Sequence, residues 1–94
     1  MDELISQMGQ LVSVIARNLV DRPQEVLVRG QEGANTMVLE LHVAKEDVGK
    51  VIGRDGRTAQ AIRTLVRAVS AKLRKRTVLE IIDQQQKIDP QWIN

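Results

Sequence analysis

The stretch that decides the fold of this chain is VGKVIGRDGR, residues 48–57. An apolar helical turn runs into Gly53, two charged residues follow, and a long basic helix begins after Gly56. Two glycines three positions apart allow backbone conformations that residues with a Cβ atom avoid. A turn of this kind can point successive N–H groups outward at the start of a helix, where the peptide dipoles add positive potential. We therefore predict a phosphate-binding turn whose partner is a nucleic-acid backbone.

The composition is that of one small globular domain. The chain has 94 residues, of which 43% are apolar and 28% charged, and this length allows one hydrophobic core. The absence of cysteine excludes disulfides, thiolate metal sites and cysteine nucleophiles. No apolar run approaches the roughly 18 residues that cross a bilayer, and the acidic start Met1-Asp2-Glu3 is unlike a secretory signal. We expect a cytoplasmic protein with no membrane association.

The charge is distributed unevenly along the chain. The net charge of +2 divides into −3 for residues 1–44, +7 for residues 45–76 and −2 for residues 77–94. The positive charge therefore gathers around the two-glycine turn and the helix after it, as expected of a nucleic-acid site. Basic residues continue along that helix, and they are equally typical of a solvated helix face: Arg63, Arg67, Lys72, Arg74, Lys75 and Arg76. The last four of these complement the C-terminal end of the helix dipole.

Periodicity predicts an α+β order of elements. We expect a helix over residues 4–20, a strand over 25–29, a turn over 30–35 and an alternating strand over 36–44 that completes a hairpin. A short helix over 45–52, a long helix over 57–76 and a third strand over 77–83 follow. Residues 1–83 then form a domain with the helices on one face of a three-stranded sheet, and residues 84–94, with Trp92, form a tail.

The predicted core is drawn from the inner face of each element. It comprises Leu4, Ile5, Met8, Leu11, Val12, Ile15 and Leu19 in the first helix, Met37, Leu39, Leu41 and Val43 in the second strand, and Ala59, Ile62, Leu65, Val66, Val69 and Leu73 in the long helix.

With this order of elements and the Gly53-Arg54-Asp55-Gly56 turn, the chain resembles a KH domain, whose GXXG loop joins two helices and clamps about four nucleotides. Val51-Ile52 before the loop and Arg57 after it match the usual extension of that motif. Two strands before the helix pair and one after resemble the bacterial, type II arrangement. A single domain of this length is similar to the bacterial KhpA family over residues 1–83.

That resemblance implies a single-stranded RNA-binding protein, an RNA chaperone and post-transcriptional regulator connected with cell shape and envelope synthesis. It also implies a homodimer, or a complex with a larger KH-containing partner of the KhpB/Jag type. Single-stranded DNA fits the same clamp. The absence of Phe and Tyr argues against RRM and OB modules, which stack bases on aromatic rings.

The expected RNA-binding residues surround the loop. Gly53 and Gly56 let the strand approach, Arg54 contacts phosphate with help from Arg57 and Lys50, and Asp55 weakens binding by adding an anion. Val48 and Ile52 are the first choices for an apolar groove that holds the bases. Further groove candidates, for which a core position is an equal alternative, are Val51, Ile62, Leu39 and Leu41. Gly53 also fits a helix C-cap, and Gly56 a tight turn.

Catalysis is not expected. The chain has one histidine, His42, and no combination of residues that supplies a nucleophile, a base or a metal site. No G-K-[ST] follows the glycines, so the loop is not a Walker motif. We expect no cofactor and no metal. The alternative to RNA binding is a KH-fold protein-interaction module, which a weak response to salt would distinguish from phosphate binding.

Overall fold

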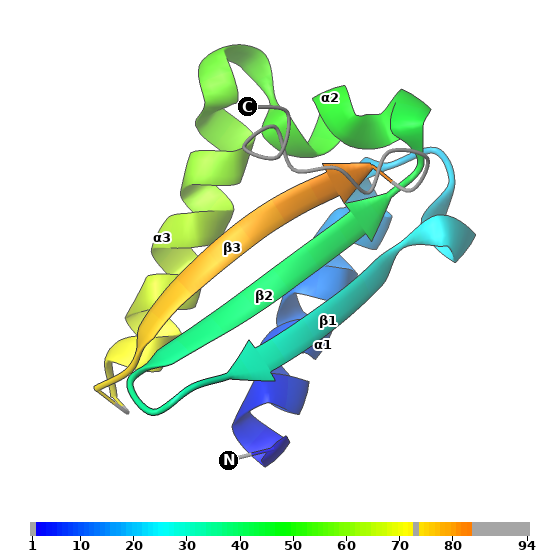
Figure 1. Ribbon diagram of the computed structural model, residues 1–94. Coiled ribbons are helices and arrows are strands. Elements are labelled where there is room, and N and C mark those ends of the chain that lie inside the picture. The colour runs from blue at the N-terminus through cyan, green and yellow to red at the C-terminus, as the bar shows by residue number, and fades with distance from the viewer. Residues whose placement is uncertain (1, 73, 84–94) are drawn as a thin grey trace, which may run out of the picture.

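The computed structural model describes residues 2–72 and 74–83 of the chain. Its elements follow the predicted order: α1 (Asp2–Leu19), β1 (Leu27–Glu32), β2 (Thr36–Val43), α2 (Val48–Ile52), α3 (Arg57–Ala71) and β3 (Arg76–Asp83) (Figure 1). Short 3-10 turns at Pro23–Glu25, Lys45–Asp47 and Arg54–Gly56 join some of them. The predicted tail, residues 84–94, lies outside the described residues.

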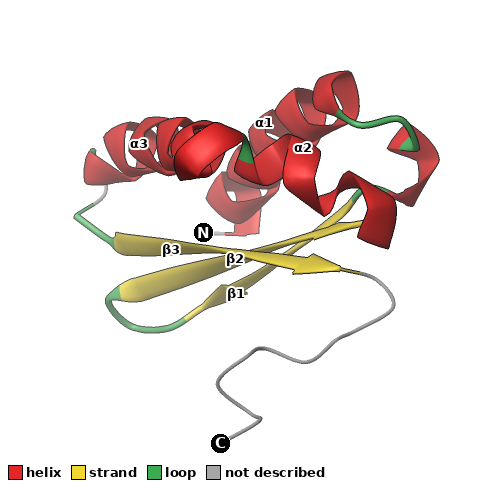
Figure 2. Ribbon diagram, turned by 90° about the horizontal axis from the view of Figure 1, so that it is seen from above, coloured by secondary structure: helices red, strands yellow, loops and turns green. Residues whose placement is uncertain are grey.

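The three strands form one sheet in the order β1-β2-β3. β1 and β2 are an antiparallel hairpin in which Leu27 faces His42, and β2 and β3 are parallel, with Thr36 opposite Arg76. The three helices lie together on one face of this sheet (Figure 2). β2 is therefore the central strand, and within the described residues β1 and β3 each have one edge without a neighbouring strand.

The core lies between the sheet and the helix layer. The predicted alternation in β2 is confirmed, because Met37, Leu39, Leu41 and Val43 all have no exposed surface. They pack in one cluster with buried residues of the helices: Met8, Val12 and Ala16 of α1, Val51 of α2, and Ile62 and Val66 of α3. The three helices and the central strand are thereby fixed relative to one another, which positions the α2–α3 turn.

Several predicted core residues lie instead at the surface. Leu11, Leu19, Leu65 and Val69 are 37%, 38%, 51% and 38% exposed. The prediction was wrong because a single layer of helices on a sheet buries only the stripe of each helix that faces the strands. Apolar side chains on the flanks of α1 and α3 consequently remain open to solvent. Leu73 lies outside the described residues.

The limits of two elements also differ from the prediction. β1 extends to Glu32, and Gly30 pairs with Leu39 inside the hairpin instead of beginning the turn. A Cβ atom on Gly30 would lie 2.2 Å from Ile5 Cγ2, so this glycine allows α1 to approach the strand closely. α3 ends at Ala71 instead of near Arg76, and Arg74 has a left-handed φ of 57° in the turn that leads into β3.

Candidate nucleic-acid interface

The α2–α3 turn reverses the chain through three residues with positive φ. α2 ends at Gly53 (φ 79°, ψ 171°), a 3-10 turn spans Arg54–Gly56, and α3 begins at Arg57. Asp55 (φ 56°) and Gly56 (φ 74°) both adopt the left-handed conformation. An aspartate tolerates this conformation better than most residues with a Cβ atom.

The two glycines serve different purposes. A Cβ atom on Gly53 would lie 2.2 Å from Thr58 Oγ1 and 2.8 Å from the Thr58 backbone nitrogen. Gly53 is therefore required by the packing of the turn, and its part in RNA binding stays a prediction. A Cβ atom on Gly56 would meet nothing within 4 Å. Gly56 thus leaves open surface at the turn.

Some of the amides in the turn are already used by the protein. The N–H of Gly53 donates to Gly49 O at 2.9 Å, that of Gly56 donates to Gly53 O at 3.1 Å, and that of Arg57 donates to Arg54 O. The amides of these three residues are therefore not free to bind a ligand. Among the residues that the structure describes, the amides of Arg54 and Asp55 have no acceptor, so a ligand oxygen has two donors at the turn.

The side chains at the tip are exposed and unpaired. Arg54, Asp55 and Arg57 are all exposed, and no ion pair within the described ranges involves any of them. Two guanidinium groups that flank two open amides form a site for an anion. Asp55 lies between the two arginines in the sequence, and its negative charge lowers the local positive potential.

Lys50 is placed differently from Arg54 and Arg57. Its ammonium lies 3.2 Å from Asp21 Oδ2 and 3.6 Å from Asp47 Oδ1. The hydrogen bond and the negative charge of Asp21 raise the pKa of Lys50, and Asp47 adds to this effect. Two carboxylates thus already balance the charge that we assigned to phosphate binding.

Asp47 anchors this side of the turn to the end of α1. It is 1% exposed, and its carboxylate accepts hydrogen bonds from the backbone N–H groups of Asp21 (3.2 Å) and Arg22 (3.0 Å). Burial favours the neutral acid, but these two donors and the Lys50 charge outweigh it and hold the pKa of Asp47 below its usual 3.8. No local pattern in the sequence predicts this role, because the two donors lie 26 and 25 residues away along the chain.

The apolar groove is narrower than predicted. Val48 and Ile52 are half-buried beside the turn and can still contact a ligand. The other four candidates belong to the core, since Val51, Leu39 and Leu41 have no exposed surface and Ile62 has 2%. Leu39 and Leu41 lie on the central strand, which the helices cover.

The strand edge nearest to α3 belongs to β3 and not to β2. Among the described residues β3 pairs with β2 alone, and the Leu79 carbonyl accepts hydrogen bonds from Arg63 Nε and Nη2 at 3.4 and 3.3 Å. From the sequence we assigned Arg63 only to the basic surface of the long helix. The signal that was available is the spacing of Arg63 and Arg67, which places them on one face of the helix.

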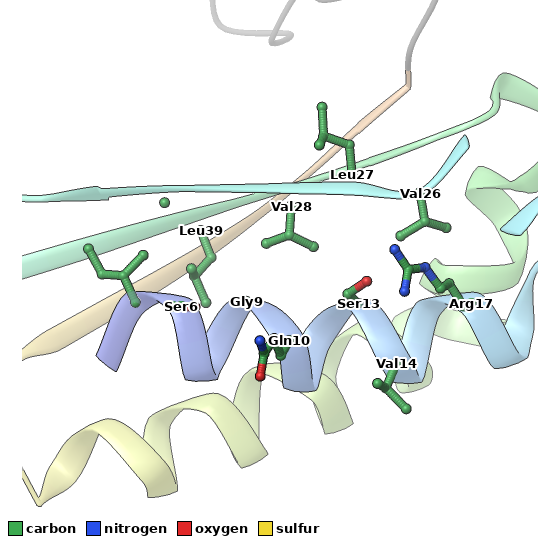
Figure 3. Close-up of a pocket in the computed structure, with 12 residues that line it drawn as sticks. Ser6, Gly9, Gln10, Ser13, Val14, Arg17, Val26, Leu27, Val28 and Leu39 are labelled. Atoms are coloured by element: carbon green, nitrogen blue, oxygen red, sulfur yellow. The ribbon is translucent and has the colours of Figure 1, made fainter. Parts of the chain in front are cut away.

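A hollow of about 490 Å³ lies between α1 and β1, at the edge of the sheet opposite to β3 (Figure 3). Val28 and Leu39 point into it from the strands, and Arg17 is the one cation among the described residues that line it. It does not extend the positive surface of the turn.

The single histidine does not form part of a metal site. His42 Nε2, on β2, lies 3.2 Å from Glu40 Oε1, and the described residues contain no group of ligands that could hold a metal ion. In the same part of the chain, no helix has the length and apolar character of a membrane span.

A three-stranded sheet of this order, with three helices on one face and a Gly-x-x-Gly turn between the second and third helices, defines a KH domain of the type II arrangement. The comparison with protein families agrees, because residues 9–81 match the KhpA/KhpB KH domain. This chain belongs to that family. The predicted fold class and family are thereby confirmed.

Curated relatives match nearly over their whole length. The RNA-binding protein KhpA of Caldanaerobacter subterraneus subsp. tengcongensis is 55% identical over 75 residues, which are 80% of this chain and 100% of the relative. The RNA-binding protein KhpA of Clostridium acetobutylicum is 53% identical over 75 residues, with the same shares covered. That of Chlamydia pneumoniae is 46% identical over 77 residues, covering 82% of this chain and 99% of the relative.

A crystal structure of Aquifex aeolicus Era bound to GDP and aluminium fluoride has a similar fold, with a TM-score of 0.54 and 19% identity. The match covers 82% of this chain and 30% of the Era chain. This likeness concerns the fold only.

Proposed function

We propose that this protein binds single-stranded RNA by holding its phosphate backbone at the Gly53-Arg54-Asp55-Gly56 turn. The observation that carries the proposal is found at one exposed turn: two amides without acceptors and two arginines without ion pairs among the residues that the structure describes. The relatives named as RNA-binding proteins support RNA as the ligand. Single-stranded DNA is the alternative substrate of the same clamp.

Each residue then has a defined part in binding. The amides of Arg54 and Asp55 donate to a phosphate oxygen, and the guanidinium groups of Arg54 and Arg57 neutralise the phosphate charge. Gly56 keeps the surface open for the backbone of the strand. Val48 and Ile52 contact the bases at the side of the turn. Lys50 contributes at long range, because Asp21 and Asp47 hold its ammonium.

Low intrinsic affinity fits a chaperone that releases its RNA. Asp55 weakens the clamp, and the described residues contain no Phe, Tyr or Trp ring on which bases stack. By family resemblance we propose post-transcriptional regulation linked to cell shape and cell wall biogenesis, carried out in the cytoplasm, where the RNA is. The role is one of binding and not catalysis, and it needs no cofactor.

We further propose that the protein acts as a homodimer or with a larger KH-containing partner. Leu11 and Val14 of α1 and Leu65 and Val69 of α3 are between 37% and 55% exposed, and α1 and α3 contact each other. Association through these side chains would bury them and bring two RNA-binding turns into one particle. Two linked sites bind one RNA more tightly than one site because the second contact is intramolecular.

The test is a gel shift with a labelled single-stranded RNA, using the Arg54→Asp and Arg29→Asp variants. Arg29 is a matched control, because it is exposed on β1, the strand at the opposite edge from β3. We expect Arg54→Asp to abolish binding and Arg29→Asp to retain most of it, with both variants folded by circular dichroism. Unchanged binding by a folded Arg54→Asp protein would exclude the turn as the RNA site.

The second candidate function is a protein-interaction module without RNA binding, which the exposed apolar side chains of α1 and α3 favour. Salt separates the two functions, because phosphate contacts weaken steeply with added salt and an apolar interface does not. Light scattering at tens of micromolar would measure association, and a strictly monomeric mass would contradict the proposed dimer.

A further inference from the structure

The face of the sheet that points away from the helices is open in the part of the chain that the structure describes. All three helices lie on the other face (Figure 2). On β1, Leu27 points away from α1, whereas Val28 points towards it (Figure 3). The residues of β2 that alternate with the core are half-buried on the same side as Leu27: Thr36, Val38, Glu40 and His42. We call this side of the sheet the outer face.

The side chains of the outer face form rows across the three strands. The register sets the members of each row: Leu27, His42 and Ile82 where β3 ends, Arg29, Glu40 and Glu80 in the middle, and Gln31, Val38 and Val78 next to the hairpin turn. Leu27 and Val78 are 44% and 38% exposed. Two rows that contain exposed apolar side chains therefore flank one charged row.

The charges of the middle row are not balanced. Glu40 and Glu80 are neighbours on the parallel strands β2 and β3, so their like charges repel each other. His42 Nε2 lies 3.2 Å from Glu40 Oε1. Glu80, in contrast, forms no ion pair with any residue that the structure describes. A cation beside Glu80 would weaken the repulsion between the two glutamates.

The sequence that follows β3 has the composition that this face requires. β3 ends at Asp83, and residues 84–94, which lie outside the described residues, read QQQKIDPQWIN. Large apolar residues occur there at Ile88, Trp92 and Ile93, and Lys87 is the one cation of the segment. Apolar side chains for the apolar rows and a cation for the glutamates are thus present in one short stretch of the same chain.

The lengths of the strand and of the segment are compatible. Glu80 lies about 10 Å back along β3 from Asp83, and Val78 about 17 Å back. On an extended chain Lys87 reaches up to about 13 Å from Asp83, and Trp92 up to about 30 Å. Both residues therefore reach their rows when the chain reverses after Asp83.

We propose that residues 84–94 fold back over the outer face of the sheet in the same molecule. Trp92 and Ile93 cover the apolar row of Val38 and Val78, because contact removes apolar surface on both sides from water. Lys87 lies beside Glu80. The domain then has three layers, and the RNA-binding turn stays accessible because it belongs to the helix layer on the opposite side of the sheet.

The experiment uses the fluorescence of Trp92 in the full chain. The protein contains one Trp and no Tyr or Phe, so its emission reports on the surroundings of this one side chain. The emission wavelength and the quenching by acrylamide are compared between the native and the urea-unfolded protein. The test variant is Val38→Ser/Val78→Ser on the outer face. The matched control is Val14→Ser/Leu65→Ser, which changes two apolar side chains of the helix layer that are 55% and 51% exposed.

We expect the native chain to emit at shorter wavelength than the unfolded chain and to be quenched less. Val38→Ser/Val78→Ser should move both quantities towards their unfolded values, while circular dichroism shows a folded domain, and the control should keep the wild-type spectrum. Glu80→Lys should also shift the emission to longer wavelength, because it places a like charge beside Lys87. The exchange variant Glu80→Lys/Lys87→Glu should regain the wild-type emission, which tests the pairing even if the serine variant does not fold.

Three results would overturn the proposal. Equal emission and quenching in the native and unfolded chain would show that Trp92 is exposed to water. A change in the Val14→Ser/Leu65→Ser protein alone would place Trp92 on the helix layer. A shift of the wild-type emission on dilution would place it on a second copy of the chain. None of these results concerns the binding of RNA through Arg54, so this proposal and the proposed function fail separately.

Discussion

The Asp55→Asn substitution should strengthen RNA binding. Asp55 is exposed at the tip of the turn, has a left-handed φ of 56°, and forms no ion pair with any described residue. Asparagine tolerates the same backbone conformation. The substitution therefore removes one negative charge and keeps the shape of the turn.

The expected gain in RNA affinity follows from the position of Asp55 next to Arg54 in the turn. For a phosphate about 6 Å away in water, the repulsion that the substitution removes is about 0.7 kcal/mol. Since 1.4 kcal/mol is a factor of ten, the affinity should rise about threefold at low salt. Added salt should reduce the gain, because the interaction is exposed to solvent.

Fluorescence anisotropy with one labelled RNA at 50 and 200 mM salt measures both quantities. Asp55→Gly is the companion variant, since it removes the same charge with a different side chain and should give a similar gain. Thermal unfolding checks that Asp55→Asn leaves the stability unchanged. An affinity that stays constant or falls in a fully folded Asp55→Asn protein would refute the placement of phosphate at this turn.

Three further predictions concern the fold around the site. Gly53→Ala should destabilise the protein by about 2–3 kcal/mol in thermal unfolding, because the backbone conformation is nearly restricted to glycine and the new Cβ atom clashes with Thr58. Gly56→Ala should lower the stability by only about 1 kcal/mol but weaken RNA binding. Equal stabilities of the two variants would contradict the different roles of the two glycines. Asp47 has a lowered pKa, so its contribution to stability is present above the unfolded pKa near 3.8 and is lost as the pH falls through the folded value. Asp47→Asn should therefore lower the melting temperature at pH 7 and flatten its decline below pH 4, which a pH series would check; a parallel decline in both proteins would count against the network. Thr77→Val should leave the stability of the free protein unchanged or raise it by up to about 1 kcal/mol, because the buried hydroxyl has no partner in residues 2–72 and 74–83. A marked loss of stability in denaturant unfolding would contradict this.

The parts of the fold that could be predicted from the sequence are those with a strong local pattern. The alternation of Met37, Leu39, Leu41 and Val43 fixes which face of β2 is buried, because the side chains of a strand alternate between its faces. The glycines at 53 and 56 fix the reversal between α2 and α3. These local signals gave the correct order of elements and the KH fold.

The errors in the predicted elements and core arise where tertiary contacts determine the structure. Gly30 has the composition of a turn, but it lies inside β1 because α1 packs against it through Ile5. Leu65 and Val69 have the spacing of a core stripe, but they lie beyond the width that one sheet covers. Neither the position of a helix on a sheet nor its distance from a strand is encoded in the periodicity of either element.

Only part of the candidate site could be predicted, because some of its features depend on contacts between distant parts of the chain. Exposure of Arg54 and Arg57 follows from their position at the tip of a turn. The pairing of Lys50 with Asp21 and Asp47 joins the end of α1 to α2, and such long-range contacts leave no local pattern. The different roles of Gly53, which is required for packing, and Gly56, which leaves the surface open, likewise depend on the position of the Thr58 side chain.

The most direct measurement of the central proposal is the salt dependence of RNA affinity for the wild-type chain and for Arg54→Gln/Arg57→Gln. If both guanidinium groups contact phosphate, the slope of log affinity against log salt should be about 1.4 smaller in the variant. The same slope in both folded proteins would show that the RNA backbone does not lie at this turn.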